Sequence, residues 1–161
     1  MLSVVIPATD APATLPRCLA ALARSAEPHE VVVVEDPGLG GPAAARNAGV
    51  ARAQGDVVVF VDADVEVHPD ALRRLRAALD ADAGLDAVFG AYDDRPAARA
   101  TVSRFRNLLH HHVHARADGP ATTFWAGLGA IRREAFDAVG GFDAERYRSP
   151  CIEDIELGMR L

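Results

Sequence analysis

The sequence predicts an α/β fold in which helices cover both faces of a mostly parallel sheet. Short apolar runs rich in valine recur along the chain, and stretches with helical spacing of apolar residues separate them. Continuous apolar runs are typical of strands buried on both faces, as in parallel sheets joined by helices. The chain has 161 residues, of which 50% are hydrophobic and 25% charged. This is the composition of one globular domain.

The first third of the chain alternates between strand and helix. Apolar runs predict strands at 2–7, 30–35 and 56–62. Between the first two, apolar residues recur at helical spacing over 14–25. A second helix is predicted over 42–53, with Pro42 in its first turn, a position that suits proline.

The remaining elements follow the same signals with less regular spacing. A helix is predicted over 69–82, where Pro69 lies in the first turn, and a strand over 85–92. An amphipathic segment at 99–116 and a strand at 122–131 come next, and Gly140-Gly141 end a short helix at 133–139. A last helix begins near Ile152 or Glu153 and meets no stop signal before Leu161. We therefore expect the chain to be a piece of a longer protein.

Charge and composition exclude several classes of protein. A net charge of -6 argues against a nucleic-acid binder, which would present a basic face. Every one of the 17 cationic residues is arginine, so a phosphate-loop lysine and a Schiff-base lysine are excluded. Two cysteines do not make a disulfide scaffold, which favours a cytoplasmic location. The sequence begins with no signal-peptide pattern, and no run approaches the ~18 apolar residues of a membrane span.

Polar or turn residues follow each of the first three predicted strands. Pro7 and Ala8 follow the first, Glu35 and Asp36 the second, and the pair Asp62 and Asp64 the third. In open α/β sheets, ligands bind beyond the carboxyl ends of the strands. The sequence therefore predicts a binding site where these three strand ends meet.

The pair Asp62 and Asp64 has two interpretations. On an extended chain the two carboxylates point to the same side, with Ala63 opposite. Carboxylates that close repel each other unless a cation or hydrogen-bond donors offset the charge. Mg²⁺ and Mn²⁺ commonly bind one or two carboxylates together with a substrate phosphate, which favours a metal-bridged nucleotide diphosphate. The alternative is a solvated turn that leads into the next helix.

Five motifs in series resemble the family-two glycosyltransferases of the GT-A fold. They are "SVVIPA", "EVVVVED", "GPAAARNAGVARAQGDVVVFVDAD", "FWAGLGAIRREAFDAVGGFD" and "IEDIELGMRL", and together they extend from Ser3 to Leu161. The resemblance implies a Rossmann-like α/β/α sandwich with residues 1–161 as one domain. It also implies that residues 1–98 bind the nucleotide sugar and that residues 99–161 carry the acceptor and catalytic part.

The resemblance implies roles for the nucleotide-side residues. Asp36 matches the acid that contacts the nucleotide base, but "EDPG" replaces the usual Asp-Asp-Gly-Ser, so either Glu35 or Asp36 faces the base. Arg46 is expected near the diphosphate, where its fork of donors can neutralise charge. Asp64 is the expected metal ligand, and Asp62 lies nearer the sugar or ribose while sharing the Mn²⁺ or Mg²⁺ site.

It also implies roles on the acceptor side. Asp154 is the expected catalytic base, and Glu153 beside it is expected to contribute to substrate binding. Trp125, the only tryptophan, falls inside the predicted strand 122–131 and is either a core residue or a stacking surface for an acceptor sugar. The family's arginine-tryptophan motif would lie beyond Leu161.

The function expected from these residues is metal-assisted transfer of a sugar to a hydroxyl group. The donor is a UDP- or GDP-sugar, and the acceptor is a glycan or a lipid-linked hydroxyl. One carboxylate base without a second nucleophile favours direct displacement with inversion. We expect no nucleic-acid partner, and membrane association, at the cytoplasmic face, only through a further C-terminal region.

The segment "LLHHHVHAR" at 108–116 contains four histidines. Neither a glutamate in the protease pattern nor a cysteine accompanies them, which favours a solvated or acceptor-facing helix face over a structural metal site. The apolar half of the same helix is open to two interpretations, packing on the sheet or contact with an anionic lipid surface.

Two other functions remain as alternatives. One is a non-catalytic domain that binds nucleotide sugars. The other is a phosphohydrolase of the haloacid dehalogenase type with "DADVEV" as its nucleophile motif, although that motif normally follows the first strand and this chain lacks lysine.

Overall fold

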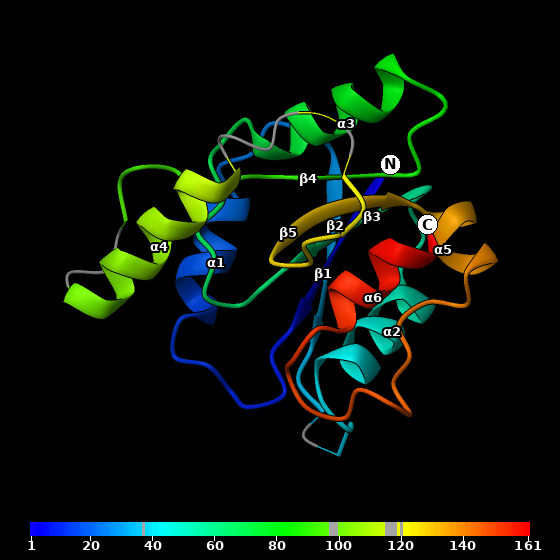
Figure 1. Ribbon diagram of the computed structural model, residues 1–161, viewed down its shortest axis with the longest axis horizontal. Coiled ribbons are helices and arrows are strands. Elements are labelled where there is room, and N and C mark those ends of the chain that lie inside the picture. Colours follow the sequence, from blue (N-terminus) through cyan, green and yellow to red (C-terminus); the bar gives the residue numbers. More distant parts are fainter. Residues whose placement is uncertain (37, 97–99, 115–118, 120) are drawn as a thin grey trace.

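Five strands form one sheet in the order β2-β1-β3-β5-β4. The computed structural model describes residues 1–36, 38–96, 100–114, 119 and 121–161. The strands are β1 (Leu2–Pro7), β2 (His29–Val34), β3 (Val57–Val61), β4 (Ala87–Phe89) and β5 (Leu128–Arg132). Figure 1 shows them in the middle of the molecule, with the helices around them.

The sheet is mostly parallel, as the sequence predicts. Strand β1 pairs in parallel with both β2 and β3, while β5 runs antiparallel to its neighbours β3 and β4. Four strands therefore point the same way, and β5 alone is reversed. Since Val61 pairs with Leu128, the first residue of β5 lies level with the last residue of β3.

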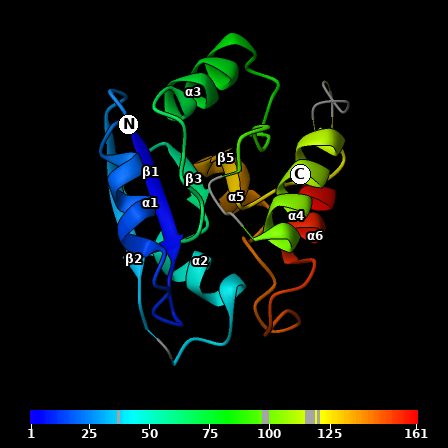
Figure 2. The ribbon, with the colours of Figure 1, turned by 90° about the vertical axis from the view of Figure 1, so that its left-hand side faces the viewer.

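Six helices surround the sheet (Figures 1 and 2). They are α1 (Leu15–Leu22), α2 (Pro42–Arg52), α3 (Ala71–Ala81), α4 (Thr101–His114), α5 (Arg133–Ala138) and α6 (Glu153–Arg160). Pro42 opens α2 as expected, whereas α3 begins two residues after Pro69. Gly140 and Gly141 end α5 as expected, because both take the positive φ angles that glycine tolerates.

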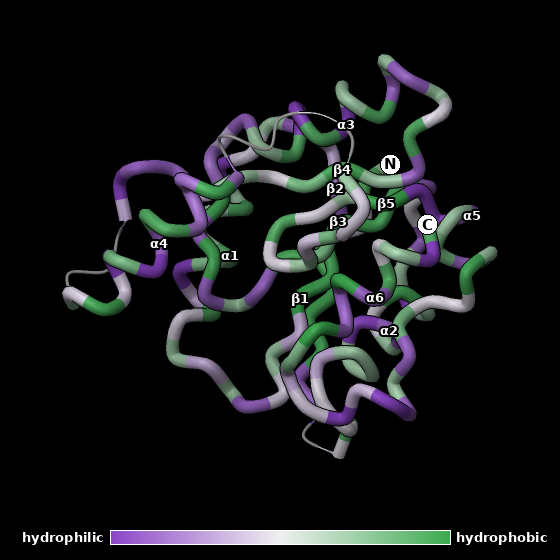
Figure 3. The backbone as a smooth tube through the Cα atoms, in the orientation of Figure 1, coloured by the Kyte–Doolittle hydropathy of each residue, from purple (hydrophilic) through white to green (hydrophobic). Residues whose placement is uncertain are grey.

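The core has one half on each face of the sheet. Alternate residues of β1 point to opposite faces, so Val4 and Ile6 pack with α1 and α3 while Val5 packs with α2 and α6. Figure 3 shows the hydrophobic residues concentrated on the central strands. The molecule is thus a three-layer α/β/α sandwich, and the fold predicted from the sequence is confirmed.

Two predicted strands differ from the observed ones. The strand predicted over 85–92 is reduced to Ala87–Phe89, and the one predicted over 122–131 begins only at Leu128. Placing Trp125 inside a strand was therefore wrong. It lies in the loop before β5, two residues before Gly127, whose carbonyl accepts from the amide of Asp62 at 3.1 Å in register with the ladder between β3 and β5.

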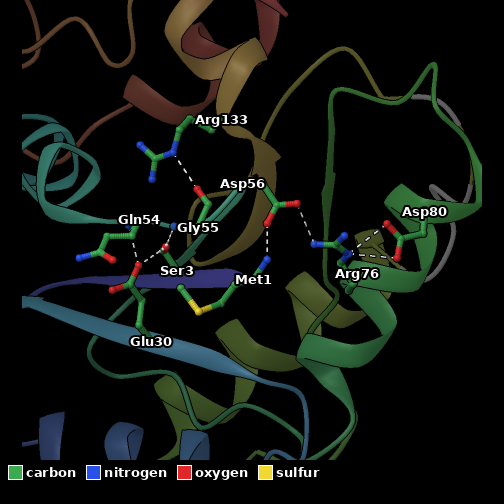
Figure 4. Close-up of polar contacts among 9 residues, drawn as sticks. All are labelled: Met1, Ser3, Glu30, Gln54, Gly55, Asp56, Arg76, Asp80 and Arg133. Carbon is green, nitrogen blue, oxygen red and sulfur yellow. Dashed lines mark hydrogen bonds and ion pairs between the residues drawn. The ribbon is translucent and has the colours of Figure 1, made fainter.

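A polar network closes the edge of the sheet at which β1 and β3 begin (Figure 4). The buried Ser3 hydroxyl donates to Glu30 and accepts from the Gly55 amide, each at 2.6 Å. Asp56 pairs with the N-terminal ammonium and, at 3.0 Å, with Arg76. Donation from Ser3, followed by the Gln54 amide, lowers the pKa of Glu30. Each acid of this network has a hydrogen-bond or ion-pair partner within the protein, so we interpret the network as structural rather than functional.

Within the part of the chain that the structure describes, no helix is long and apolar enough to cross a membrane.

Candidate active site

The opposite edge of the sheet collects the residues that the sequence singles out. Strands β1, β2 and β3 all end there, since Pro7 pairs with Val34 and β3 lies parallel to β1. The reversal of β5 brings its preceding loop, with Trp125, to the same edge, because Leu128 is level with Val61. The reversed strand therefore joins segments from both halves of the sequence at one place.

The two aspartates after β3 lie in a turn. The Val65 amide donates to the carbonyl of Asp62 at 2.9 Å, so the chain bends directly after the strand. Ala63 is buried, Asp62 is half-buried and Asp64 is exposed. The two carboxylates are thus on the outer side and Ala63 on the inner side, as the alternation predicts. Among the described residues, none donates a hydrogen bond to the Asp64 side chain.

A buried arginine donates hydrogen bonds to two carboxylates of the site, Asp62 and Glu153. Arg46 is 5% exposed and reaches from α2 to the edge. Its Nη2 donates to Asp62 Oδ1 at 2.8 Å, and its Nη1 donates to Glu153 Oε1 at 2.9 Å. The Phe142 ring lies 5.5 Å from the guanidinium carbon. The donors expected near a diphosphate are therefore engaged with Asp62 and Glu153, which fixes both acids in place.

Opposing influences set the pKa of Asp62. Burial raises the pKa, the adjacent Arg46 lowers it, and the negative charges of Asp64 and Asp154 raise it again, so that it lies above its ordinary value. The side chain keeps 39% of its surface exposed, and water screens part of these effects. Four carboxylates thus share this edge with one guanidinium, and the excess negative charge is what a divalent cation would offset.

The same charges reach the cysteine beneath the turn. The Cys18 thiol is buried and lies 3.7 Å from the carbonyl oxygen of Asp62. Burial, followed by the charges of Asp64 and Asp62, raises the pKa of Cys18 to about 11. The thiol therefore stays neutral, as a buried core residue does, and does not serve as a nucleophile.

The two acids at the start of α6 face different partners. Glu153 is buried, and its Oε2 accepts from the Cys151 amide at 2.9 Å while Oε1 holds Arg46. Burial raises the pKa of Glu153, but these donors together lower it below its usual value. Asp154 is half-buried and accepts from the amides of Ala126 at 3.2 Å and Ile155 at 2.8 Å. Asp154 therefore faces the loop before β5, and Glu153 faces the interior.

Aromatic side chains line the site next to that loop. The half-buried Trp125 ring lies 5.0 Å from the ring of His110 and 5.3 Å from that of His114, both on α4. Tyr92 stacks on His110 at 5.3 Å. Burial, then the charges of Asp64 and Asp62, raises the pKa of Tyr92, which places this cluster beside the carboxylates. Trp125 is thus only partly buried among these rings, and its role as a stacking surface for an acceptor sugar stays a prediction.

The histidines on α4 contribute rings rather than a metal cluster. Among the residues that the structure describes, no group of three or more His, Cys, Asp or Glu side chains is arranged to hold a metal ion. Burial, then the neighbouring His110, lowers the pKa of His114. A cation at this edge would therefore need oxygen atoms of a ligand in addition to Asp62 and Asp64, which is the ligand set common for Mg²⁺ and Mn²⁺.

The ends of β1 and β2 form the remaining side of the edge. The Ala8 amide donates to the Val34 carbonyl at 2.8 Å, and the whole residue is buried, so Ala8 offers no surface to a ligand, unlike the role expected for it. Glu35 and Asp36 are both exposed. The Asp36 carboxylate accepts from the Gly38 amide at 2.8 Å and shapes the following turn.

Sequence reasoning missed Tyr92 and Asn47. Asn47 directly follows Arg46 and exchanges two hydrogen bonds with the main chain of Phe142, at 2.8 and 3.0 Å. It thereby ties α2 to the loop after α5. Its place in "AARNAG" was the available signal. A separate surface hollow of about 480 Å³ lies beside it, and it contains none of the four carboxylates described above.

Comparisons with known proteins agree on one family. The sequence profile of Glycosyl transferase family 2 matches residues 37–140. The probable glycosyltransferase YdaM of Bacillus subtilis (strain 168) is 30% identical over 144 residues, covering 82% of this chain and 32% of that protein. The chain therefore spans about a third of its curated relative.

Two solved structures show the same fold. The mannosyltransferase PcManGT from Pyrobaculum calidifontis, in complex with GDP-Man and Mn²⁺, has a TM-score of 0.71 at 21% identity, covering 97% of this chain and 50% of that one. Residues 1–349 of TarS from S. aureus, in complex with UDP-GlcNAc, have a TM-score of 0.67 at 20% identity, covering 99% and 52%. The sandwich is thus that of the GT-A glycosyltransferases.

Proposed function

The chain belongs to glycosyl transferase family 2, and on that premise we propose that it transfers a sugar from a nucleotide-diphosphate sugar to an acceptor hydroxyl. One observation carries the proposal. The exposed carboxylate of Asp64 has no partner among the described residues and lies beside Asp62 and Asp154, where the strand ends meet. This family assignment replaces the phosphohydrolase alternative.

Asp64 and Asp62 would hold a divalent cation, Mn²⁺ or Mg²⁺, together with the donor diphosphate. The excess of carboxylates over cations at this edge supports that site, as does the Mn²⁺ present with GDP-Man in PcManGT. Bound there, the cation would supply Lewis-acid stabilisation of the leaving diphosphate. Arg46 orients Asp62 through their hydrogen bond and favours its ionised form, and so acts on the donor through that carboxylate.

The loop ends of β1 and β2 would take the nucleotide. Pro7 lines one side, and Glu35 or Asp36 accepts a hydrogen bond from the base. Because the Asp36 carboxylate already accepts the Gly38 amide, Glu35 is the freer of the two acids. The neighbouring structures contain GDP-Man in one case and UDP-GlcNAc in the other, so UDP- and GDP-sugars are both candidates.

Asp154 would act as the general base. Its carboxylate faces the loop that carries Trp125, and it would accept the proton of the acceptor hydroxyl as that oxygen bonds to the anomeric carbon. The bond to the diphosphate breaks in the same step, with inversion. Glu153 does not compete for this role because it is buried and paired with Arg46, whereas Asp154 is only half-buried and has no arginine partner among the described residues. Trp125 would offer its ring to the acceptor.

The test is donor cleavage with water as the acceptor, measured as release of UDP or GDP in the presence of Mn²⁺. We expect Asp154→Asn to lower the rate by about a hundredfold or more, because a positioned base contributes 10²–10⁴. Nucleotide binding by calorimetry should stay within about twofold of the parent, since Asn keeps the size of Asp. The matched control is Asp137→Asn, an exposed acid on α5 with no side-chain hydrogen bond among the described residues.

Two outcomes would contradict the assignment. A normal rate for Asp154→Asn together with an inactive Glu153→Gln would exchange the roles of the two acids. A parent chain that binds the nucleotide sugar tightly and never cleaves it would favour the non-catalytic binding domain.

A further inference from the structure

Helix α4 exposes its apolar side chains to solvent. The structure describes all of Thr101–His114, and within this range no side chain is buried. Five large hydrophobic residues are 39–66% exposed: Val102, Phe105, Leu108, Leu109 and Val113. A helix on the surface of a globular protein normally turns such a stripe toward the core. Contiguous exposed apolar side chains mark an interaction surface.

The contacts of α4 with the rest of the protein come from its polar side. Asn107 donates to the main-chain carbonyl of Asp93 at 2.8 Å, and His111 Nδ1 lies 2.7 Å from that of Tyr92. His110 and His114 pack on Trp125. At 100° per residue, Asn107, His110, His111 and His114 fall within about 100° of arc on one side of the helix.

The apolar stripe lies opposite these contacts. By the same rotation, Val102, Phe105, Leu109 and Val113 fall within about 80° of arc, centred on the far side of the helix. In Figure 1 the helix projects from one side of the sandwich, and Figure 3 shows hydrophobic positions along it although it lies outside the sheet layers. Packing of the apolar half on the sheet is therefore excluded for the described part of this segment, which leaves the lipid interpretation.

The charges around the stripe suit an anionic surface. The chain carries a net charge of -6, yet Thr101–His114 contains no aspartate or glutamate. By the helical rotation, Arg106 borders the stripe about 20° beyond Val113. Arg104 lies on the other side, about 100° from Phe105, with Leu108 between them. Of the nearby acids, Asp93 lies on the contact side, where its main chain meets Asn107, and Asp94 lies 3.7 Å from Arg95.

We propose that α4 binds the surface of an anionic lipid bilayer, with its apolar stripe among the acyl chains near the headgroups and Arg104 and Arg106 at the phosphates. An apolar face bordered by arginine is the pattern of helices that lie in the interface. Because the histidine side of α4 packs on Trp125, the transfer site would then sit close to the lipid surface. This inference goes beyond the proposed function, and it adopts one of the two interpretations that the sequence left open for the apolar half of this helix.

Vesicle flotation of the whole chain tests the proposal without any donor or acceptor. We expect the parent to float with vesicles of phosphatidylcholine and phosphatidylglycerol, and to bind phosphatidylcholine alone several-fold more weakly. Changing both Phe105 and Leu109 to serine should lower the partition coefficient on the order of tenfold or more, since both side chains are already exposed and folding does not need them. Arg104→Gln with Arg106→Gln should remove most of the preference for the anionic vesicles.

The matched control is Met159→Ser, which removes an exposed apolar side chain from α6 and should leave flotation unchanged. Equal flotation of the parent and the Phe105/Leu109 variant would overturn the proposal, as would a parent that binds neither vesicle. Sedimentation analysis tests whether a second copy of the chain, rather than lipid, covers the stripe. If the parent self-associates without lipid and the same double variant is monomeric, a second copy of the chain covers the stripe and the lipid assignment is wrong.

Discussion

One buried guanidinium arranges the acids of the site. Arg46 donates to Asp62 with one nitrogen and to Glu153 with another. These two acids lie far apart in the sequence. The pairing turns Glu153 inward and leaves its neighbour Asp154 facing the loop before β5. The different surroundings of these two adjacent carboxylates thus follow from which of them reaches the arginine, and they support the proposed role of Asp154 as the base.

Replacing Glu153 by glutamine should cost stability in a pH-dependent way. At neutral pH we expect a loss of about 3 kcal/mol, because breaking a buried ion pair leaves Arg46 with one partner fewer. The pKa of Glu153 is lowered in the folded protein, so its ionised form contributes stability above its unfolded value of 4.5, and this contribution is lost as the pH falls through the folded value. The difference between parent and variant should therefore shrink well below pH 4.5.

Urea unfolding at neutral and acidic pH measures both effects. Glu134→Gln, at an exposed acid on α5, is the control and should change the free energy of unfolding by less than about 0.5 kcal/mol. A Glu153→Gln variant as stable as this control at neutral pH would show that the buried pair does not hold the site together.

The sequence indicates some of these residues better than others. Asp62 and Asp64 could be predicted because they follow a continuous apolar run, where a charge is exposed only at the strand end. The partners of Arg46 could not, because Glu153 lies 107 residues away and the contact depends on how α2 and α6 pack. Nothing in the sequence alone indicates that this arginine is only 5% exposed, because its burial depends on the fold.

At the scale of elements, the reversed strand β5 decides what reaches the site. The valine runs predicted β1, β2 and β3 closely, since their apolar residues are local signals. The run "TTFW" before β5 has high strand propensity but forms a loop, because tertiary contacts at Asp62 and α6 override that propensity. The orientation of α4 was equally beyond sequence reasoning, since a helical stripe does not say whether it faces the core or the outside.

Helix α6 depends on a close approach to that loop. A Cβ atom at Gly158 would lie 2.1 Å from the Phe124 amide nitrogen, a main-chain atom that no rotamer change can move. Alanine normally stabilises a helix by about 1 kcal/mol relative to glycine, but here the overlap forces the helix away from the loop. We expect Gly158→Ala to lower the free energy of unfolding by a net of about 1–2 kcal/mol, because overlap with main-chain atoms puts the overpacking cost near the top of its range of about 1–3 kcal/mol.

Gly40→Ala is the matched control, because a Cβ atom there would have no heavy atom within 4 Å. Urea unfolding should show this variant close to the parent. If Gly158→Ala proved more stable than the parent, as helix propensity alone predicts, the contact between α6 and the loop would not exist as described.

At the scale of the whole molecule, the two edges of the sheet differ in how their charges are balanced. At the edge where β1 begins, Asp56 and Glu30 both have donors, and the network closes on itself (Figure 4). At the other edge Arg46 pairs with Asp62 and Glu153, Asp154 accepts only from main-chain amides, and Asp64 has no donor among the residues described. The carboxylates at the first edge are balanced by donors, whereas negative charge remains unbalanced at the second. This difference supports the proposed binding of a cation and its ligand at the second edge.

Calorimetry with Asp64→Ala tests this central claim most directly. Titration of UDP and of GDP into the chain, with and without Mn²⁺, should show binding of at least one nucleotide that requires the metal. The Asp64→Ala variant should bind that nucleotide at least about tenfold more weakly, because it loses a charged metal ligand. Its free energy of unfolding should stay within about 0.5 kcal/mol of the parent, since the side chain is exposed. Asp137→Ala, at an exposed acid remote from the edge, should bind as the parent does. Equal affinity of the parent and Asp64→Ala, or nucleotide binding that is indifferent to Mn²⁺, would contradict the account.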